Sequence, residues 1–198
     1  MTTSEEKQQL RSAVRTQARQ LPVSYRADAD REIADRFFSL PYYRESGTVF
    51  CFVSTRREIN TLPILRDALA RGKTLCVPRC TAGHQIELCS IRSLEELSPG
   101  SYGILEPAVS CPLVPAEQVD LAVIPCLACS RAGQRLGQGG GYYDRFLSTY
   151  RGMAVMLCRE RQLQDEIPLE PHDFVIPCVL TESGLFQDGT CCRPGRRF

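Results

Sequence analysis

Apolar residues recur every three to four positions in several segments of the chain, which is the spacing of amphipathic helices. Over residues 4–20, for example, Leu10, Ala13 and Val14 would share one helix face. Pro22 ends this helix because proline cannot donate a backbone hydrogen bond. The pattern predicts helices over residues 4–20, 24–38, 61–70 and 142–150, and shorter ones over 93–97 and 160–165.

Short apolar runs separate these helices and predict buried strands. The clearest is residues 47–53, and the others are 74–77 (ending at Pro78), 85–89, 121–124, 153–157 and 178–181. Residues 99–118 and 125–141 are predicted loops, and we expect a loose tail over 184–198. Strands that alternate with helices predict a single α/β domain over 1–198, Rossmann-like, in which helices flank a mostly parallel sheet in three layers.

Composition narrows the function classes. Of 198 residues, 24 are Lys or Arg and 23 are Asp or Glu, so the net charge of +1 gives no global support for nucleic-acid or membrane-surface binding. No apolar run approaches the roughly 20 residues that cross a membrane, and the polar N-terminal residues do not match a secretory signal. The 11 cysteines are an odd number and lie mostly in apolar stretches, which favours reduced thiols and the cytoplasm.

The most distinctive segment is the glycine-rich stretch 133–144, between a predicted strand and a predicted helix. Its glycines allow backbone N–H groups to approach a ligand closely, and a helix N-terminus attracts anions. Arg135 adds a guanidinium that matches phosphate geometry. Asp144, in the first helical turn, suits either Mg²⁺ or the helix dipole. A flexible linker would not carry these residues between strand and helix, so the segment predicts a phosphate site.

Three other residues fit either ligand binding or an ordinary surface. Lys7 and Arg11 lie one turn apart on the first helix, where they would bind phosphates or form a solvated basic face. Glu58 follows the first strand, at the place where α/β folds contact their ligands. The alternative for Glu58 is a surface loop.

Two late features are also ambiguous. Cys126 and Cys129 form a CxxC, but the sequence offers neither a thioredoxin-like context nor a second ligand pair, so ordinary thiols are favoured. His172 and Asp173 lie near prolines, which is typical of a turn. Asp173 would be a second metal ligand if the fold returned it to the glycine-rich segment.

With its glycine-rich segment and several other matching residues, the chain resembles the 5-formyltetrahydrofolate cyclo-ligases, also called 5,10-methenyltetrahydrofolate synthetases. Residues 135–144 are close to the family pattern R-x-G-x-G-x-G-Y-Y-D. The chain also has the Lys7-x-x-Leu10-Arg11 pattern at its start. Further matches are Glu58, Thr61, Gly72-Lys73, Pro78, residues 103–107, Asp120, His172-Asp173 and Thr181. The family loop often has Lys where this chain has Gly140.

The resemblance implies the conversion of 5-formyltetrahydrofolate to 5,10-methenyltetrahydrofolate with ATP and Mg²⁺, through a phosphorylated formyl group and with release of ADP and phosphate. It implies small-molecule substrates, no nucleic-acid or membrane partner, and a cytoplasmic monomer. Two alternatives stay open. One is a non-catalytic nucleotide- or folate-binding module on the same fold, and the other is a thiol redox protein that uses Cys126 and Cys129.

The same resemblance implies roles for individual residues. The catalytic residues would be Arg135, Tyr142 and Asp144, and the metal ligands Asp144 and Asp173. The ATP-binding residues would be Lys7, Arg11, Arg135, Leu136, Gly137, Gln138, Gly139, Gly140, Gly141, Tyr142 and Tyr143. The folate-binding residues would be Val53, Glu58, Gly139, Gly140, Gly141 and Tyr142.

Overall fold

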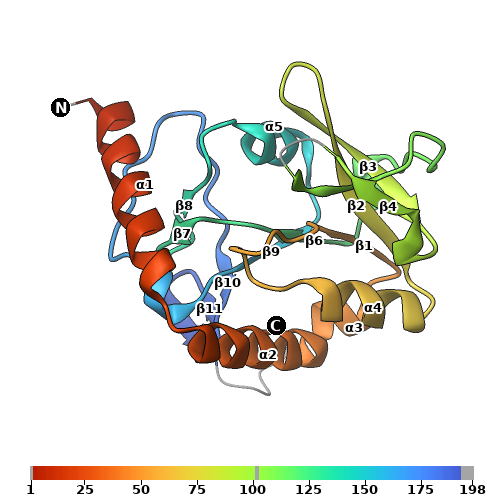
Figure 1. Ribbon diagram of the computed structural model, residues 1–198, viewed down its shortest axis with the longest axis horizontal. Helices are drawn as coiled ribbons and strands as arrows, with labels where there is room; N and C mark the ends of the chain where they lie inside the picture. Colours follow the sequence, from red (N-terminus) through yellow and green to blue (C-terminus); the bar gives the residue numbers. More distant parts are fainter. Residues whose placement is uncertain (1, 101–102, 193–198) are drawn as a thin grey trace.

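The computed structural model describes residues 2–100 and 103–192. An eight-stranded sheet runs through it in the order β12-β11-β10-β9-β6-β1-β2-β3 (Figure 1). The strands are β1 (Thr48–Cys51), β2 (Thr74–Thr81), β3 (Gln85–Ile91), β6 (Leu121–Ile124), β9 (Met153–Leu157), β10 (Cys178–Leu180), β11 (Leu185–Gln187) and β12 (Thr190–Cys192). The strands from β10 to β2 pair in parallel, and the edge strands pair antiparallel. The predicted mostly parallel sheet is confirmed.

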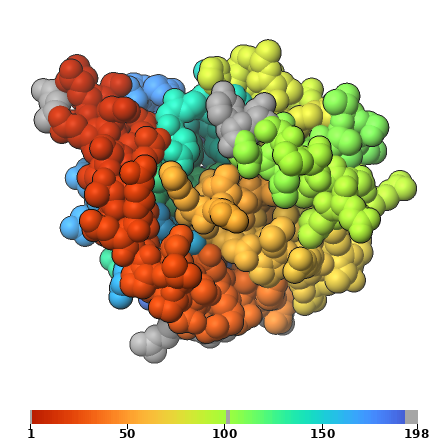
Figure 2. All heavy atoms as spheres, in the orientation of Figure 1, coloured from red at the N-terminus to blue at the C-terminus, as the bar shows by residue number. Residues whose placement is uncertain are grey.

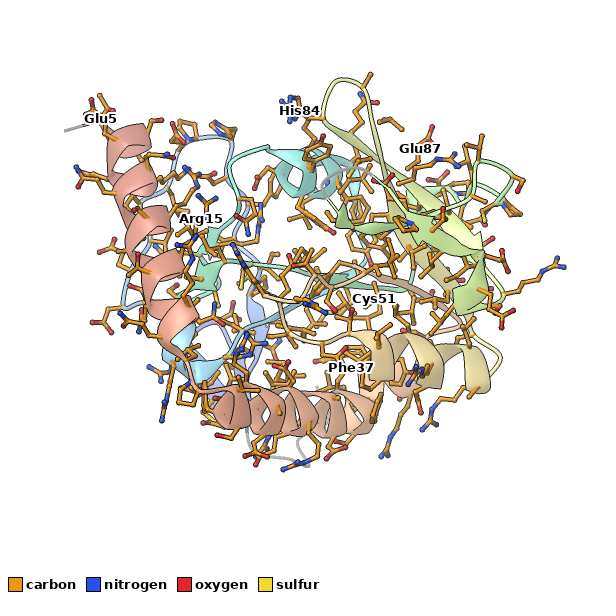
Figure 3. The ribbon with its side chains drawn as sticks, viewed as in Figure 1. Glu5, Arg15, Phe37, Cys51, His84 and Glu87 are labelled. Carbon is orange, nitrogen blue, oxygen red and sulfur yellow. The ribbon has the colours of Figure 1, made fainter. Side chains whose placement is uncertain are left out.

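Helices cover both faces of the sheet, as predicted. The helices α2 (Val23–Ser39), α3 (Pro41–Glu45) and α4 (Leu62–Ala70) pack on one face, and α5 (Tyr142–Thr149) packs on the other (Figure 1). Side chains alternate along a strand, so Cys51 contacts the first layer and Phe50 the second. Figure 3 shows Phe37 pointing from α2 toward the sheet.

The helix α1 (Thr3–Gln20) stands at one end of these layers (Figure 1). Its apolar contact is small, because Val14 packs in a minor cluster with Leu127, Leu136 and Ile167. Among the residues that the structure describes, no helix combines the length and the apolar character that a membrane span requires.

Short elements replace some predicted ones. Residues 160–165 hold only a 3₁₀ turn, η4 (Glu160–Gln162), after which Leu163 forms an isolated β-bridge with Cys129. The 99–118 loop contains β5 (Leu105–Pro107), which pairs with β4 (Leu97–Pro99), and η3 (Ala116–Gln118). The 125–141 loop contains the two-residue strands β7 (Ala128–Cys129) and β8 (Arg135–Leu136). The predicted 93–97 helix is the 3₁₀ turn η1 (Leu94–Glu96).

The predictions for the end of the 74–77 strand and for the C-terminal tail are wrong. Strand β2 does not stop at Pro78, which pairs with Leu88 of β3. The last residue of β2 that pairs with β1 is Cys76, so Pro78 lies where one side of the strand is free, and a sheet tolerates proline there. The expected loose tail instead forms β11 and β12, whose antiparallel ladder extends the sheet from β10. Residues 193–198 of that tail lie outside the described residues.

Candidate active site

A cleft of about 620 Å³ opens beside α1, at the carboxyl ends of β1 and β6. Figure 2 shows the recess between the red spheres of α1 and the yellow-green spheres of the β2–β3 hairpin, with teal spheres of the glycine-rich segment inside it. Every residue that the sequence assigned to ATP, folate or metal lines this cleft: Lys7, Arg11, Val53, Glu58, Arg135, Leu136, Gly137, Gln138, Gly139, Gly140, Gly141, Tyr142, Tyr143, Asp144 and Asp173. The fold therefore brings these separate segments together, while their individual roles stay predictions.

The glycine-rich loop between β8 and α5 forms one wall. Gly139 and Gly141 have φ values of +102° and +69°, a region that side chains other than glycine rarely adopt. A Cβ at Gly139 would lie 3.5 Å from Cζ of Arg11, an ordinary van der Waals contact, so the need for glycine there comes from the backbone conformation. Arg11 Nε donates to the carbonyl oxygen of Gly137 at 3.0 Å. This contact fixes the basic face of α1 against the loop.

Arg135 and Asp144 form an ion pair in the cleft wall. The Nη2 atom of Arg135 donates to Oδ1 of Asp144 at 2.7 Å, and their side chains are 5% and 18% exposed. Within the described part of the chain, the buried Nε of Arg135 has no hydrogen-bond partner. The guanidinium also lies 5.9 Å from the ring centre of Tyr143, whose pKa is raised well above its ordinary value by burial. Arg135 thus faces the cleft with donor capacity that its protein neighbours do not use.

Lys7, one turn before Arg11 on α1, pairs with two carboxylates of the cleft. Its Nζ donates to Oε2 of Glu170 at 2.8 Å and to Oδ2 of Asp173, although the Lys7 side chain is only 4% exposed. Burial raises the pKa of Asp173, but hydrogen bonds from the Glu170 backbone N–H and from Lys7 outweigh it and leave that pKa below its ordinary value. The oxygens of Glu170 and Asp173 lie within 4.8 Å of each other and of a His172 ring nitrogen. Asp173 therefore does return to the cleft, with Glu170 beside it.

Glu58 lies in the loop that follows β1. The buried Arg159, which the sequence did not indicate, holds this loop in place. Oε2 of Glu58 accepts hydrogen bonds from the N–H and the hydroxyl of Thr55 at 2.8 and 2.9 Å. Arg159, 2% exposed, donates to the Glu58 carbonyl oxygen at 2.8 Å. It also grips both carboxylate oxygens of Asp30 at 2.7 and 2.9 Å. Nothing in the local sequence marks Arg159, because Asp30 and the Glu58 loop, its main partners, belong to two distant segments.

The β2–β3 hairpin supplies further lining residues that the sequence did not indicate. Cys80, Ile86 and His84 all border the cleft. The ring centre of His84 lies 5.1 Å from that of Tyr142 at a steep angle, and Figure 3 shows His84 at the hairpin tip beside α5. The hairpin thus covers the tyrosine that was predicted to contact folate. A strand that reads as ending at Pro78 could not predict this contact.

Comparisons with known proteins agree with this geometry. The sequence matches the profile of the 5-formyltetrahydrofolate cyclo-ligase family over residues 3–182. A mitochondrial 5-formyltetrahydrofolate cyclo-ligase of Arabidopsis thaliana is 30% identical over 208 residues, which cover 91% of this chain and 75% of the relative. The 5-formyltetrahydrofolate cyclo-ligase of Escherichia coli K12 is 28% identical over 181 residues, covering 88% of this chain and 99% of the relative.

Solved structures are similar over nearly the whole fold. The NMR structure of a 5,10-methenyltetrahydrofolate synthetase from Aquifex aeolicus superposes with a TM-score of 0.83 at 29% identity, and covers 97% of this chain and 95% of that one. A 5,10-methenyltetrahydrofolate synthetase from Mycoplasma pneumoniae superposes with a TM-score of 0.72 at 16% identity, covering 89% and 99%, which supports the fold alone.

Proposed function

This chain belongs to the 5-formyltetrahydrofolate cyclo-ligase family, and we propose that its cleft binds ATP and the folate side by side for the reaction of that family. The protein is an ATP-dependent ligase that converts 5-formyltetrahydrofolate to 5,10-methenyltetrahydrofolate. The observation that carries the site proposal is the single cleft of about 620 Å³ that all the candidate residues share.

The chemistry that we propose has two steps. The formyl oxygen is amide-like and a poor leaving group, so it first attacks the γ-phosphorus of ATP; the new O–P bond forms as the bond to ADP breaks. N10 of the folate then attacks the activated formyl carbon and loses its proton. The C–O bond breaks, and phosphate leaves with the former formyl oxygen. Such transfers depend mainly on positioning and charge neutralisation.

The charged residues of the cleft suit that task. Lys7 and Arg135 are each paired with a carboxylate of the chain, so neither is an uncompensated buried charge. A polyphosphate offers such cations new oxygen partners, and we assign Lys7, Arg11 and Arg135 to it. The N–H groups around Gly139 lie at the start of α5, where a helix favours anions.

The folate would occupy the part of the cleft next to Val53, Glu58 and Tyr142. The carboxylate of Glu58 is oriented by Thr55, so it is placed to accept hydrogen bonds from N–H donors of the pterin. Tyr142 and the adjoining glycines of the loop would place the formyl group beside the phosphates. We therefore assign Arg135, Tyr142 and Asp144 to the reacting end.

The cleft also suits Mg²⁺. This ion prefers carboxylate oxygens and usually takes one or two of them together with substrate phosphates. Asp144 and Asp173 have side chains that are 18% and 10% exposed, and both line the cleft. We propose that they hold the ion, with Glu170 as a further oxygen donor. When bound, Mg²⁺ would supply positive charge against the phosphate oxygens.

Three broader expectations belong to the same proposal: that residues 1–198 work as one domain, that the protein is a monomer, and that it acts in the cytoplasm. The name of the Arabidopsis relative places that protein in mitochondria. The rival binding-module hypothesis is countered by the carboxylates Asp144 and Asp173, which a mere nucleotide binder does not require.

The test mixes the purified protein with 5-formyltetrahydrofolate and MgATP and follows the methenyl chromophore. We expect the chromophore only when ATP and Mg²⁺ are both present. Chromophore formation without Mg²⁺ would refute the metal assignment. ATP binding in a thermal-shift assay without any chromophore would favour the binding module.

A further inference from the structure

The CxxC that the active-site proposal leaves unused gains a third thiol in the folded chain. The Sγ atoms of Cys126, Cys129 and Cys158 all lie within 4.8 Å of one another. Strands β6 and β9 are parallel neighbours in which Ile124 pairs with Met156. Cys126 and Cys158 each come two residues after that pair, so both thiols lie at the same edge of the sheet. The backbone then curls into β7 and brings Cys129 back to them.

We infer that Cys126, Cys129 and Cys158 form a binding site for a thiophilic divalent metal ion such as Zn²⁺. Zinc–sulfur bonds of about 2.3 Å set three ligand sulfurs roughly 3.8–4.0 Å apart. The observed spacing therefore requires each sulfur to move by no more than about 1 Å. Zinc usually has four ligands, so three cysteines need one further donor. Because the cluster borders the cleft, a water molecule has room to be that fourth ligand.

The surroundings favour bound thiolates. The positive charges of Arg135 and Arg159 both act on the Cys126 sulfur. Three thiolates with one divalent ion carry a net negative charge, and the two guanidiniums, each also paired with a carboxylate, lie near that charge. Binding replaces three S–H bonds by three metal–sulfur bonds and releases the protons to solvent, without any change of oxidation state.

The position of the cluster gives the ion a route in from solvent and predicts an effect of the bound ion on activity. Cys129 and Cys158 are 0% and 2% exposed, but Cys126 is only partly buried. Cys126 lines both the main cleft and an adjoining cavity of about 300 Å³. An ion held there would lie next to Arg135, in the part of the cleft that we assign to ATP, so we expect it to slow the cyclo-ligase reaction. That consequence rests on the proposed function, whereas metal binding does not.

The experiment titrates reduced, metal-free protein with Cd²⁺ under anaerobic conditions and follows thiolate-to-metal charge-transfer absorption. We expect saturation at one ion per chain. In Cys126→Ser the affinity should fall by at least roughly 100-fold, because even changes outside the ligand shell cost about 10- to 100-fold. Cys80→Ser is the matched control: Cys80 borders the same cleft outside the cluster, and its variant should keep the signal.

Circular dichroism checks that Cys126→Ser is folded, and Cys158→Ala serves as a second ligand variant. An absent charge-transfer band in the unchanged protein, or an equal band in Cys126→Ser, overturns the metal site. Cyclo-ligase assays with and without Zn²⁺, in excess Mg²⁺, test the consequence separately. Full activity with the metal bound would refute the inhibition and leave the site standing, whereas inactivity of the metal-free protein would count against the proposed function alone.

Discussion

Replacement of Arg135 by alanine tests most sharply how the cleft holds ATP. The variant removes a guanidinium that is 5% exposed and whose Nε has no partner within the described residues. A hydrogen bond to a charged group contributes about 1.5–3 kcal/mol. Since each 1.4 kcal/mol is a factor of ten, the KM for ATP should rise by roughly 10- to 150-fold. The KM for the folate should change much less.

The same substitution leaves Asp144 without its cation, which bears on stability. Breaking a fully buried pair costs about 3–5 kcal/mol. Because the Asp144 side chain is 18% exposed, hydration should reduce this loss to roughly 1–2 kcal/mol. Assays well below the melting temperature therefore separate ATP binding from unfolding.

Initial rates of methenyl formation against ATP, at saturating folate, give the first KM, and the reverse design gives the second. Arg131→Ala is the control, since that guanidinium is half exposed and pairs with Glu160. An ATP KM equal to that of the control, or a rise confined to the folate KM, would refute the role of Arg135.

Three further variants test other parts of the site. Asp144→Asn should lose most of its turnover and its dependence on Mg²⁺ with an unchanged circular dichroism spectrum; retained turnover would contradict the metal assignment. Arg159→Met should lower the free energy of unfolding in urea by about 3 kcal/mol, because it strands the Asp30 carboxylate; a change below about 1 kcal/mol would argue against it. Asp173 has a lower pKa in the folded protein than in the unfolded chain, so its ionised form stabilises the fold. The difference in free energy of unfolding between the unchanged protein and Asp173→Asn should therefore be largest above about pH 5 and should shrink as the pH falls through the folded-state pKa. Lys7→Met should weaken this pH dependence, and unfolding curves at several pH values measure it.

Local sequence patterns were sufficient to predict those features whose residues all lie in one contiguous segment. The periodicity of α1 and α2 and the apolar run of β1 predict these elements, because each depends on residues that are close in sequence. The same holds for the glycine-rich loop, whose glycines, Arg135 and Asp144 belong to one contiguous stretch.

The features that the sequence did not predict depend on contacts between residues that are far apart in the chain. Pro78 continues a strand only because the neighbouring strand β1 has already ended. Arg159 holds the Glu58 loop through contacts with residues more than 100 positions away. Cys158 completes a thiol cluster because β9 lies beside β6, which no spacing along the chain reveals.

The proposed function depends above all on transfer of the γ-phosphoryl group of ATP to the formyl oxygen in this cleft. The direct measurement uses 5-formyltetrahydrofolate with heavy oxygen in the formyl group and analyses the released phosphate by mass spectrometry. We expect each phosphate formed with MgATP to carry that heavy oxygen atom. Phosphate without the label, released while methenyltetrahydrofolate accumulates, would contradict that transfer.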